Sequence, residues 1–202
     1  DARRPKARLA AIGTDAPMAA HLALQAARRA APAARRFIAT GDAAAASGLS
    51  LQRARPWLNG DGPAGSDSSN QASDHAVALG DLFAGKRVAV FGVPAPFTGT
   101  CTEQHVPGYA ALAGDFEAKG VDVVCFSVAC PYAMRGWQQA MGVDETAMTF
   151  LADDLGAVTA AWGVAKDYSG TSLGPRSERF SMLVDDGTVK AFTIVDDAAA
   201  DA

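Results

Sequence analysis

Two apolar segments joined by a helix-length stretch constrain the fold of this chain more than any other feature. The run "VDVVCFSVA", residues 121–129, is continuous and rich in β-branched residues, which is typical of a strand buried on both faces. The run "RVAVFGV", residues 87–93, predicts an earlier strand, and residues 101–119 predict a helix that ends at Gly120. Such a strand–helix–strand unit makes its two strands parallel, with a right-handed crossover.

The segments that follow continue the alternation of helices and strands. "YAMRGWQQAMG" after Pro131 predicts a second helix, because proline is favourable in a first turn. "MTFLAD" (148–153) predicts a short strand and "GAVTAAWGV" (156–164) a short helix. Residues 179–195 predict a β-hairpin that turns at an Asp-Gly pair. The sequence therefore predicts an α/β fold whose mixed central sheet is flanked by helices, with the antiparallel hairpin last.

The stretch before the first of these strands has the composition of a linker. "NGDGPAG" is followed by "SDSSNQASD", which has turn-forming residues and no apolar period. The domain proper therefore begins within residues 50–76. We expect three parts: an extension over residues 1–55, a linker over 56–75 and one folded domain over 76–202, which is a common domain size.

Charge is distributed unevenly along the chain. Residues 1–55 hold ten Lys or Arg against three acids, whereas the whole chain has a net charge of −4. A basic, Ala-rich leader of this kind is typical of a mitochondrial or chloroplast transit segment or its retained remainder. An exposed amphipathic helix such as "MAAHLALQAARRAA" explains it equally well. Nucleic-acid binding is disfavoured, because no aromatic residues are interleaved with these arginines. No run approaches the roughly 18 apolar residues of a membrane span, so we expect a soluble protein of an organelle.

The three cysteines, Cys101, Cys125 and Cys130, do not form a metal-binding or scaffold pattern. There is no paired C-x-x-C for zinc, and three cysteines are too few for a disulfide framework in a chain of this length. We expect reactive or buried thiols, with no metal and no other cofactor.

Cys101 stands at the end of a loop whose composition is unusual. Two prolines, glycines and threonines precede it in "FGVPAPFTGTC", just where the first strand gives way to a helix. A thiol reacts as its thiolate, which the amide groups and dipole of a helix start favour. A small apolar residue packed under the helix start is the alternative, because free cysteine is often buried. The crowded loop favours a preorganised pocket for a small polar substrate.

These residues resemble a known family. "PAPFTGTC" fits the P-x-x-x-T-x-x-C pattern of peroxiredoxins, and "CTEQHVPGY" is similar to their type II, atypical two-cysteine branch. The resemblance covers roughly residues 76–195, including "GVDVVCFSV" and "GPRSERFSMLVDDGTVK", and leaves residues 1 to about 50 outside it. It implies a thioredoxin-like fold and an antioxidant enzyme that reduces hydrogen peroxide and organic hydroperoxides through a cysteine sulfenic acid.

The resemblance also implies a role for each residue of the motif. Cys101 would be the peroxidatic cysteine, Thr98 the hydroxyl that binds peroxide and thiolate, and Pro94 the shield of the pocket. Arg179 would place a guanidinium beside the sulfur, since a fixed cation favours thiolate over thiol. Arg176 is the rival, expected instead on a loop surface. His105, one turn after the cysteine, is expected to be a structural histidine that hydrogen-bonds around the site.

The route by which the enzyme is reset stays open at this point. Cys125 lies where plant relatives have a resolving cysteine, although a thiol inside an apolar strand is usually inert core. The other route is reduction by glutathione with glutaredoxin, or by thioredoxin. Cys130 replaces an Asp that would cap the following helix, so it either weakens that helix or supplies an extra thiol.

Two departures from the family pattern support a second hypothesis. Gly99 replaces a common Pro, and the sequence ends without the helix expected after the hairpin. With the basic extension, these features are compatible with a peroxiredoxin-like domain kept as a structural or binding subunit of an organellar assembly. A homodimer is compatible with either hypothesis.

Overall fold

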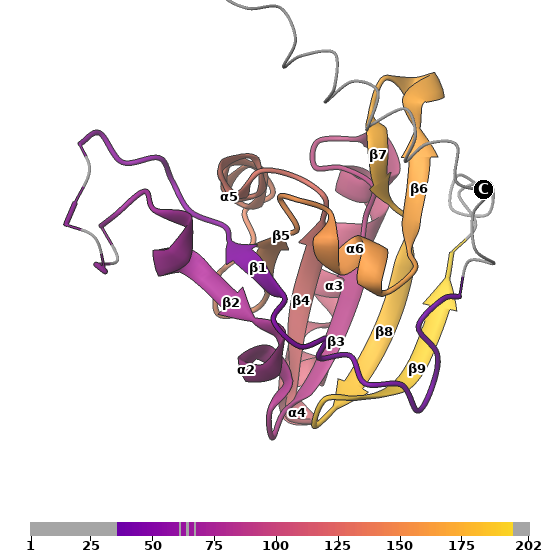
Figure 1. The fold of residues 1–202 in the computed structure, drawn as a ribbon. Coiled ribbons are helices and arrows are strands. Elements are labelled where there is room, and N and C mark those ends of the chain that lie inside the picture. Colours follow the sequence, from indigo (N-terminus) through magenta and orange to yellow (C-terminus); the bar gives the residue numbers. More distant parts are fainter. Residues whose placement is uncertain (1–35, 61, 64, 67, 196–202) are drawn as a thin grey trace, which may run out of the picture. The chain divides into compact units, whose positions relative to one another are not determined.

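The computed structural model describes residues 36–195 except 61, 64 and 67, and these form the fold shown in Figure 1. The strands are β1 (Ser50–Arg53), β2 (Ala76–Ala78), β3 (Arg87–Gly92), β4 (Val121–Ser127), β5 (Thr149–Ala152), β6 (Ala165–Tyr168), β7 (Gly174–Ser177), β8 (Phe180–Asp185) and β9 (Thr188–Ile194). The α-helices are α2 (Leu79–Phe83), α3 (Val106–Ala111), α4 (Ala113–Ala118), α5 (Pro131–Ala140) and α6 (Ala157–Ala161). Three short non-α helical segments are η1 (Ala72–His75), η2 (Cys101–His105) and η3 (Ser169–Thr171).

Seven strands form one mixed sheet in the order β2-β1-β5-β4-β3-β8-β9, and β6 and β7 pair separately. β3, β4 and β5 are mutually parallel, whereas β8 runs antiparallel to β3 and pairs with β9 in a hairpin. The hairpin turns at Asp186 and Gly187, which have φ values of 43° and 73°, the left-handed conformation that a tight two-residue turn requires. The predicted mixed sheet, parallel unit and terminal hairpin are therefore confirmed.

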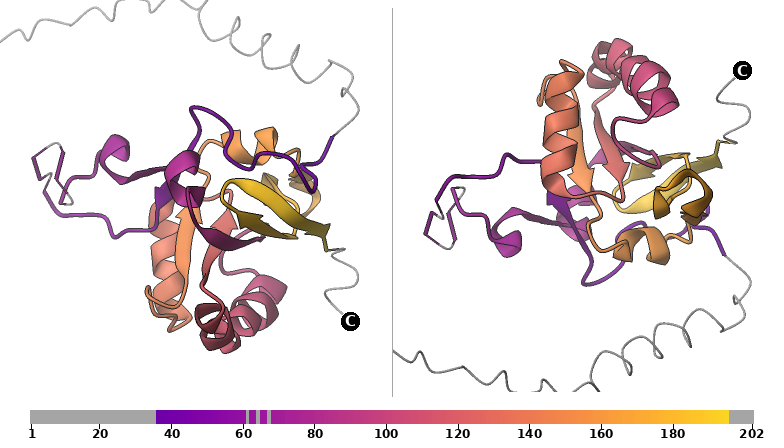
Figure 2. Two further views of the ribbon diagram at one scale, coloured as in Figure 1. Left: turned by 90° about the horizontal axis from the view of Figure 1, so that it is seen from below. Right: turned by 90° about the horizontal axis from the view of Figure 1, so that it is seen from above.

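Strand β4 is buried on both faces, as its apolar run predicts. Val124 and Phe126 belong to one core cluster, together with residues of α2 and α6. Val123 and Cys125 point the other way into a second cluster, with residues of α3 and α5. Figure 2 shows the helices on the two sides of the sheet. None of the helices in the described ranges is long and apolar enough to cross a bilayer.

The segment between β3 and β4 is not the single helix expected over residues 101–119. It begins with the π-helical turn η2, in which the amide of Val106 donates to the carbonyl of Cys101, and continues as α3 and α4 with a break at Leu112. Pro107 explains the widened turn, because its ring would clash with a carbonyl in the preceding turn and it has no amide hydrogen to donate. Gly120 follows with φ of 62°, as predicted for the residue after a helix.

Residues 36–53, which the sequence assigns to an extension, belong to the folded unit. β1 lies between β2 and β5 in the sheet, and Ile38, Ala44 and Leu51 are part of the core. The Trp162 indole donates to the carbonyl of Ala44 at 3.0 Å, which ties this segment to α6. A four-residue strand inside an Ala-rich stretch has too weak a pattern to recognise. The segment "MAAHLALQAARRAA" lies outside the described residues, as do the others up to residue 35.

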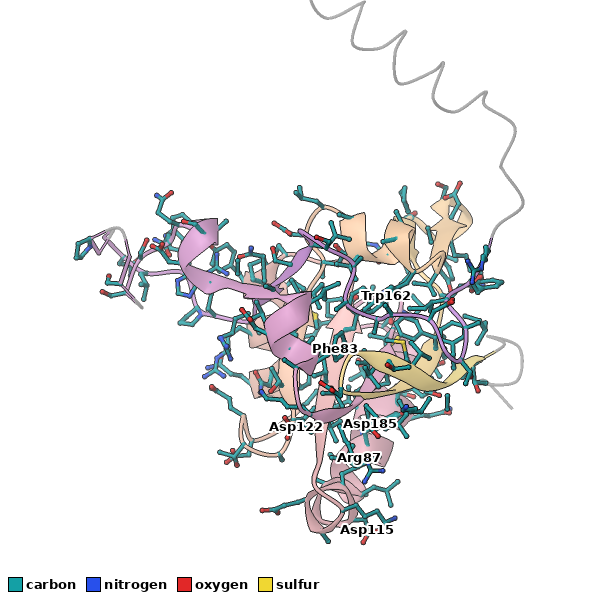
Figure 3. The ribbon with its side chains drawn as sticks, turned by 60° about the horizontal axis from the view of Figure 1, so that its bottom comes forward. Phe83, Arg87, Asp115, Asp122, Trp162 and Asp185 are labelled. Atoms are coloured by element: carbon teal, nitrogen blue, oxygen red, sulfur yellow. The ribbon has the colours of Figure 1, made fainter. Side chains whose placement is uncertain are left out.

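Charged side chains lie at the end of the sheet where β3 and β4 begin and β8 ends. Figure 3 labels Arg87, Asp122 and Asp185 there, and Arg87 and Asp185 are paired in register between β3 and β8. Phe83 and Trp162, labelled in the same view, belong to the core cluster that α2 and α6 cover. The candidate site lies at the opposite end, where β3 ends.

Replacing Leu51 tests whether the N-terminal strand contributes to the core. Leu51→Ala deletes a fully buried side chain, so we expect the free energy of unfolding to fall by about 2–5 kcal/mol. Leu155→Ala, at a leucine that is 86% exposed, is the matched control and should change it by less than about 0.5 kcal/mol. Urea unfolding measures both, and equal effects would contradict the assignment of β1 to the core.

Candidate active site

The loop after β3 is held by hydrogen bonds to two neighbouring segments. The amide of Val93 donates to the carbonyl of Phe126 at 2.9 Å, and its carbonyl accepts from the Ser177 hydroxyl at 3.2 Å. The carbonyl of Pro94 accepts from the Ser127 hydroxyl at 3.4 Å. Since both hydroxyls are buried, the backbone leading to Cys101 is fixed from two sides.

Thr98 ends this loop and starts the helical segment. Its carbonyl accepts from the amide of Thr102 at 3.0 Å, and its own hydroxyl donates to the carbonyl of Ala95 at 2.9 Å. That hydroxyl has one hydrogen, so its oxygen remains able to accept. Phe97, just before it, has φ of 62°, a left-handed conformation that strains the backbone of a residue other than glycine. Its side chain is 59% exposed.

Neither the backbone conformation nor the space around position 99 requires a glycine there. Its φ lies outside the left-handed region, and a Cβ built on it would meet no atom within 4 Å. The structure therefore has room for a side chain at this position.

Cys101 and Arg179 meet, although 78 positions separate them in the sequence. The Arg179 Nη1 atom lies 3.3 Å from the Cys101 Sγ atom, and both residues are buried, with Cys101 only 1% exposed. Arg179 directly precedes β8, and its carbonyl accepts from the amide of Val195 at 2.8 Å. The antiparallel register of β8 against β3 brings the guanidinium to the end of β3.

His105 contacts the same guanidinium. Its Nδ1 atom lies 2.7 Å from the Arg179 Nη1 atom. A guanidinium nitrogen can only donate, so His105 Nδ1 accepts and the ring's hydrogen is on Nε2. The histidine is therefore neutral in this arrangement and positions Arg179, in keeping with the structural role expected of it.

Arg176, the rival cation, is used elsewhere. Its Nε atom donates to the carbonyl of Leu173 at 2.9 Å and its Nη1 atom to the carbonyl of Val128. These bonds fasten the loop before Arg179 to the end of β4.

Trp137 also belongs to this site, although the sequence motifs do not include it. Its indole nitrogen donates to the Thr102 hydroxyl at 3.1 Å, and its ring is fully buried between α5 and the sheet. A buried indole needs an acceptor, which is the signal that points to it. Trp137 thereby fixes the residue next to Cys101.

The other two cysteines differ sharply in environment. Cys125 is fully buried in β4, in the same core cluster as Cys101, and burial raises the pKa of its thiol well above the usual range, with the neighbouring charge of Cys101 adding to the rise. Cys130 is exposed and caps α5, its sulfur accepting from the amide of Ala133 at 3.4 Å. Among the residues that the structure describes, no three His, Cys, Asp or Glu side chains gather to hold a metal ion.

Comparison with known proteins identifies the family. Residues 59–201 match the Redoxin family model. The chain is 42% identical over 151 residues to peroxiredoxin-2F, mitochondrial, of Arabidopsis thaliana, covering 74% of this chain and 70% of that protein. The chain belongs to the peroxiredoxin family. It is also 38% identical over 126 residues to peroxiredoxin-2E-2, chloroplastic, of Oryza sativa subsp. japonica, covering 61% of this chain and 56% of that one.

A solved structure agrees. Reduced Prx3 from Vibrio vulnificus in complex with hydrogen peroxide superposes with a TM-score of 0.64 and 30% identity, covering 80% of this chain and 90% of that one. This peroxiredoxin therefore has the thioredoxin-like fold and is a thiol-dependent peroxidase, an oxidoreductase that acts on peroxides.

The buried thiol of Cys125 should make stability depend on pH. An unfolded cysteine ionises near pH 8.5, whereas the raised pKa of Cys125 keeps it protonated in the native state. Above that pH the native state holds a proton that the unfolded state has lost, so the free energy of unfolding falls as pH rises, by up to about 1.4 kcal/mol per pH unit.

Urea unfolding under reducing conditions between pH 8 and pH 10 measures this slope. Cys125→Ala should flatten it, while the other two cysteines are present in both proteins and their contribution cancels in the comparison. Equal slopes in the two proteins would show that Cys125 is not the source.

Proposed function

We propose that Cys101 is the peroxidatic cysteine of this enzyme and Arg179 its activating cation. The distance of 3.3 Å between Arg179 Nη1 and Cys101 Sγ carries the proposal. The thiolate attacks one peroxide oxygen, the O–O bond breaks, and the leaving oxygen takes up a proton to depart as water or an alcohol. Cys101 becomes a sulfenic acid. The guanidinium favours the thiolate and stabilises the negative charge that moves onto the leaving oxygen.

Thr98 and Pro94 complete the proposed site. Because the Thr98 hydrogen is directed to the carbonyl of Ala95, its oxygen accepts a hydrogen bond from the peroxide O–H. Pro94 shields the pocket from water, and its carbonyl is held by Ser127. Reduced Prx3 of Vibrio vulnificus, solved in complex with hydrogen peroxide, supports hydrogen peroxide as a substrate, and organic hydroperoxides are proposed beside it.

An external thiol resets the sulfenic acid in this proposal. The first thiol displaces water to form a mixed disulfide with Cys101, and a second thiol then releases the reduced enzyme. Glutathione with glutaredoxin, or thioredoxin, are the proposed reductants. The burial and raised pKa of Cys125 disfavour it as the resolving cysteine, because its attack would need η2 to unwind and the thiol to ionise.

We place the enzyme in a mitochondrion or a chloroplast. The names of its relatives, one mitochondrial and one chloroplastic, support this, as does the basic leader in the sequence. A homodimer or a larger assembly is the proposed oligomeric state.

Stopped-flow consumption of hydrogen peroxide by the reduced enzyme tests the catalytic roles. Cys101→Ser should abolish it, and Arg179→Gln should slow it roughly 10²–10³-fold, as for loss of a preorganised charge in other active sites. Arg87→Gln is the matched control and should keep the rate, since Arg87 is exposed at the opposite end of the sheet. Consumption no faster than by free cysteine would contradict these roles and favour a domain retained for binding.

Mass spectrometry after one equivalent of peroxide tests the resolving step. We expect a sulfenic acid at Cys101, converted to a glutathione adduct when glutathione is added. A disulfide between Cys101 and Cys125 would overturn external resolution, and the Cys125→Ala variant is the control for that assignment.

A further inference from the structure

The burial of Cys101 limits which molecules can reach its sulfur. Only 1% of the residue is exposed, and the Arg179 Nη1 atom lies 3.3 Å from the Sγ atom. Glutathione, one of the proposed reductants, is a tripeptide and far larger than hydrogen peroxide, and its own sulfur has to contact the Sγ atom of oxidised Cys101. The segment η2, which carries Cys101, therefore has to move away from this closed conformation before glutathione reacts.

This movement is the main requirement of the external route. Glutathione ionises in solvent, so it has no counterpart of the burial that raises the pKa of the Cys125 thiol. The rate at which glutathione meets oxidised Cys101 then depends on how often η2 opens. The contacts that keep η2 closed thus control the resetting step.

The backbone of η2 gives limited support of its own. Its π-helical bond runs from the amide of Val106 to the carbonyl of Cys101. The next bond of this pattern would join residue 107 to the carbonyl of Thr102, but residue 107 is a proline and has no amide hydrogen. Side chains from other elements therefore have to supply part of the support.

Trp137 supplies such support from α5. Its Nε1 atom donates to the Thr102 Oγ1 atom at 3.1 Å. α5 lies on the same side of the sheet as the helices after β3 (Figure 2). The Trp137 ring is fully buried there, with its centre 5.6 Å from that of the Phe150 ring in β5. The donor is therefore fixed in the core, whereas its acceptor belongs to the segment that has to move.

Opening of η2 breaks this bond at a cost. Thr102 is half-buried, so its hydroxyl can bond water once η2 moves. The indole N–H belongs to a fully buried ring and loses its acceptor when Thr102 leaves. A buried donor that has lost its partner raises the free energy of the open conformation.

We propose that the Trp137–Thr102 hydrogen bond sets how readily η2 opens, which makes Trp137 a positioning residue that limits the access of thiols to oxidised Cys101. This rests on the proposed role of Cys101. In the open conformation the glutathione sulfur bonds to the Sγ atom of Cys101, the bond from Sγ to oxygen breaks, and the hydroxyl leaves as water with the proton of the thiol. Peroxide attack belongs to the closed conformation, in which Arg179 contacts the sulfur.

Amide hydrogen exchange of the reduced full chain measures the opening itself. Trp137→Phe keeps an aromatic ring and removes the donor, so the Val106 amide should exchange roughly tenfold faster. Tenfold corresponds to about 1.4 kcal/mol, the size expected for one hydrogen bond with a buried partner. Thr102→Val removes the acceptor and should have a similar effect, and the double variant should exchange no faster than the faster single variant. Thr102→Ser keeps the hydroxyl and should exchange as the parent does.

Trp162→Phe is the matched control. The Trp162 indole is also buried and donates to the carbonyl of Ala44 at 3.0 Å, in the other core cluster. Its loss removes a comparable hydrogen bond without touching η2, so the Val106 amide should keep the parent's exchange rate.

Stopped-flow reaction of oxidised Cys101 with glutathione measures the consequence. Trp137→Phe and Thr102→Val should accelerate this step roughly tenfold, whereas oxidation by hydrogen peroxide should not gain in rate. Trp162→Phe should leave both steps at the parent's rates. A tryptophan that only stabilised the core would not accelerate one step selectively.

The proposal is overturned by unchanged exchange at Val106 in Thr102→Val, by an equal rise in Trp162→Phe, or by a glutathione step that is not accelerated. Thr102 is half-buried, so its variant keeps the test decisive where Trp137→Phe fails to fold. Exchange is measured without peroxide. A chain that forms no sulfenic acid at Cys101 would therefore contradict the peroxidase proposal, while the exchange rates would still decide whether this bond controls the opening of η2.

Discussion

One buried guanidinium organises the candidate active site of this peroxiredoxin. Arg179 Nη1 contacts both Cys101 Sγ, at 3.3 Å, and His105 Nδ1, at 2.7 Å, away from bulk water. In such surroundings a cation interacts much more strongly with a thiolate than with a thiol. The imidazole contributes by staying neutral, since a protonated ring would place two cations in contact. The chemistry proposed for Cys101 therefore depends on this contact.

The topology of the sheet brings this contact together. β8 pairs antiparallel with β3, and Gly92 lies opposite Phe180 in that register, next to Arg179. A Cβ on Gly92 would lie 2.0 Å from the Phe180 ring, so only glycine lets the two strands close at this point. The parallel strand β4 supports the other side through the bond between Val93 and Phe126. The position of the loop that carries Cys101 therefore depends more on the pairing of β3 with β8 and β4 than on the loop's own residues.

Sequence patterns predicted the parts of this structure that depend on local chemistry. The double-faced burial of β4, the Asp-Gly hairpin and the helix after Pro131 follow from periodicity and turn preferences. The family motif brought Cys101, Thr98, Pro94 and Arg179 forward as candidates, and the structure brings Cys101 and Arg179 into contact. The motif could not predict the Arg179–His105 bond or the Trp137–Thr102 bond. Both bonds join segments that are distant in the sequence and are brought together only by the whole fold. β1 was not predicted, because its four residues form too short a pattern and the strand depends on pairing with β2 and β5.

Gly99 shows how little of the preorganisation is local. A glycine at the start of a helix raises the entropy of the unfolded chain, and here neither a positive φ nor a close neighbour requires it. The loop is held instead from outside, because Ser127 and Ser177 bind its backbone and Trp137 binds Thr102 beyond it. Glycine in place of the family's proline is therefore expected to act mainly through the unfolded chain. The loop before Cys101 is therefore held by contacts from three other segments, and its geometry does not depend on a stiffening residue at position 99 alone.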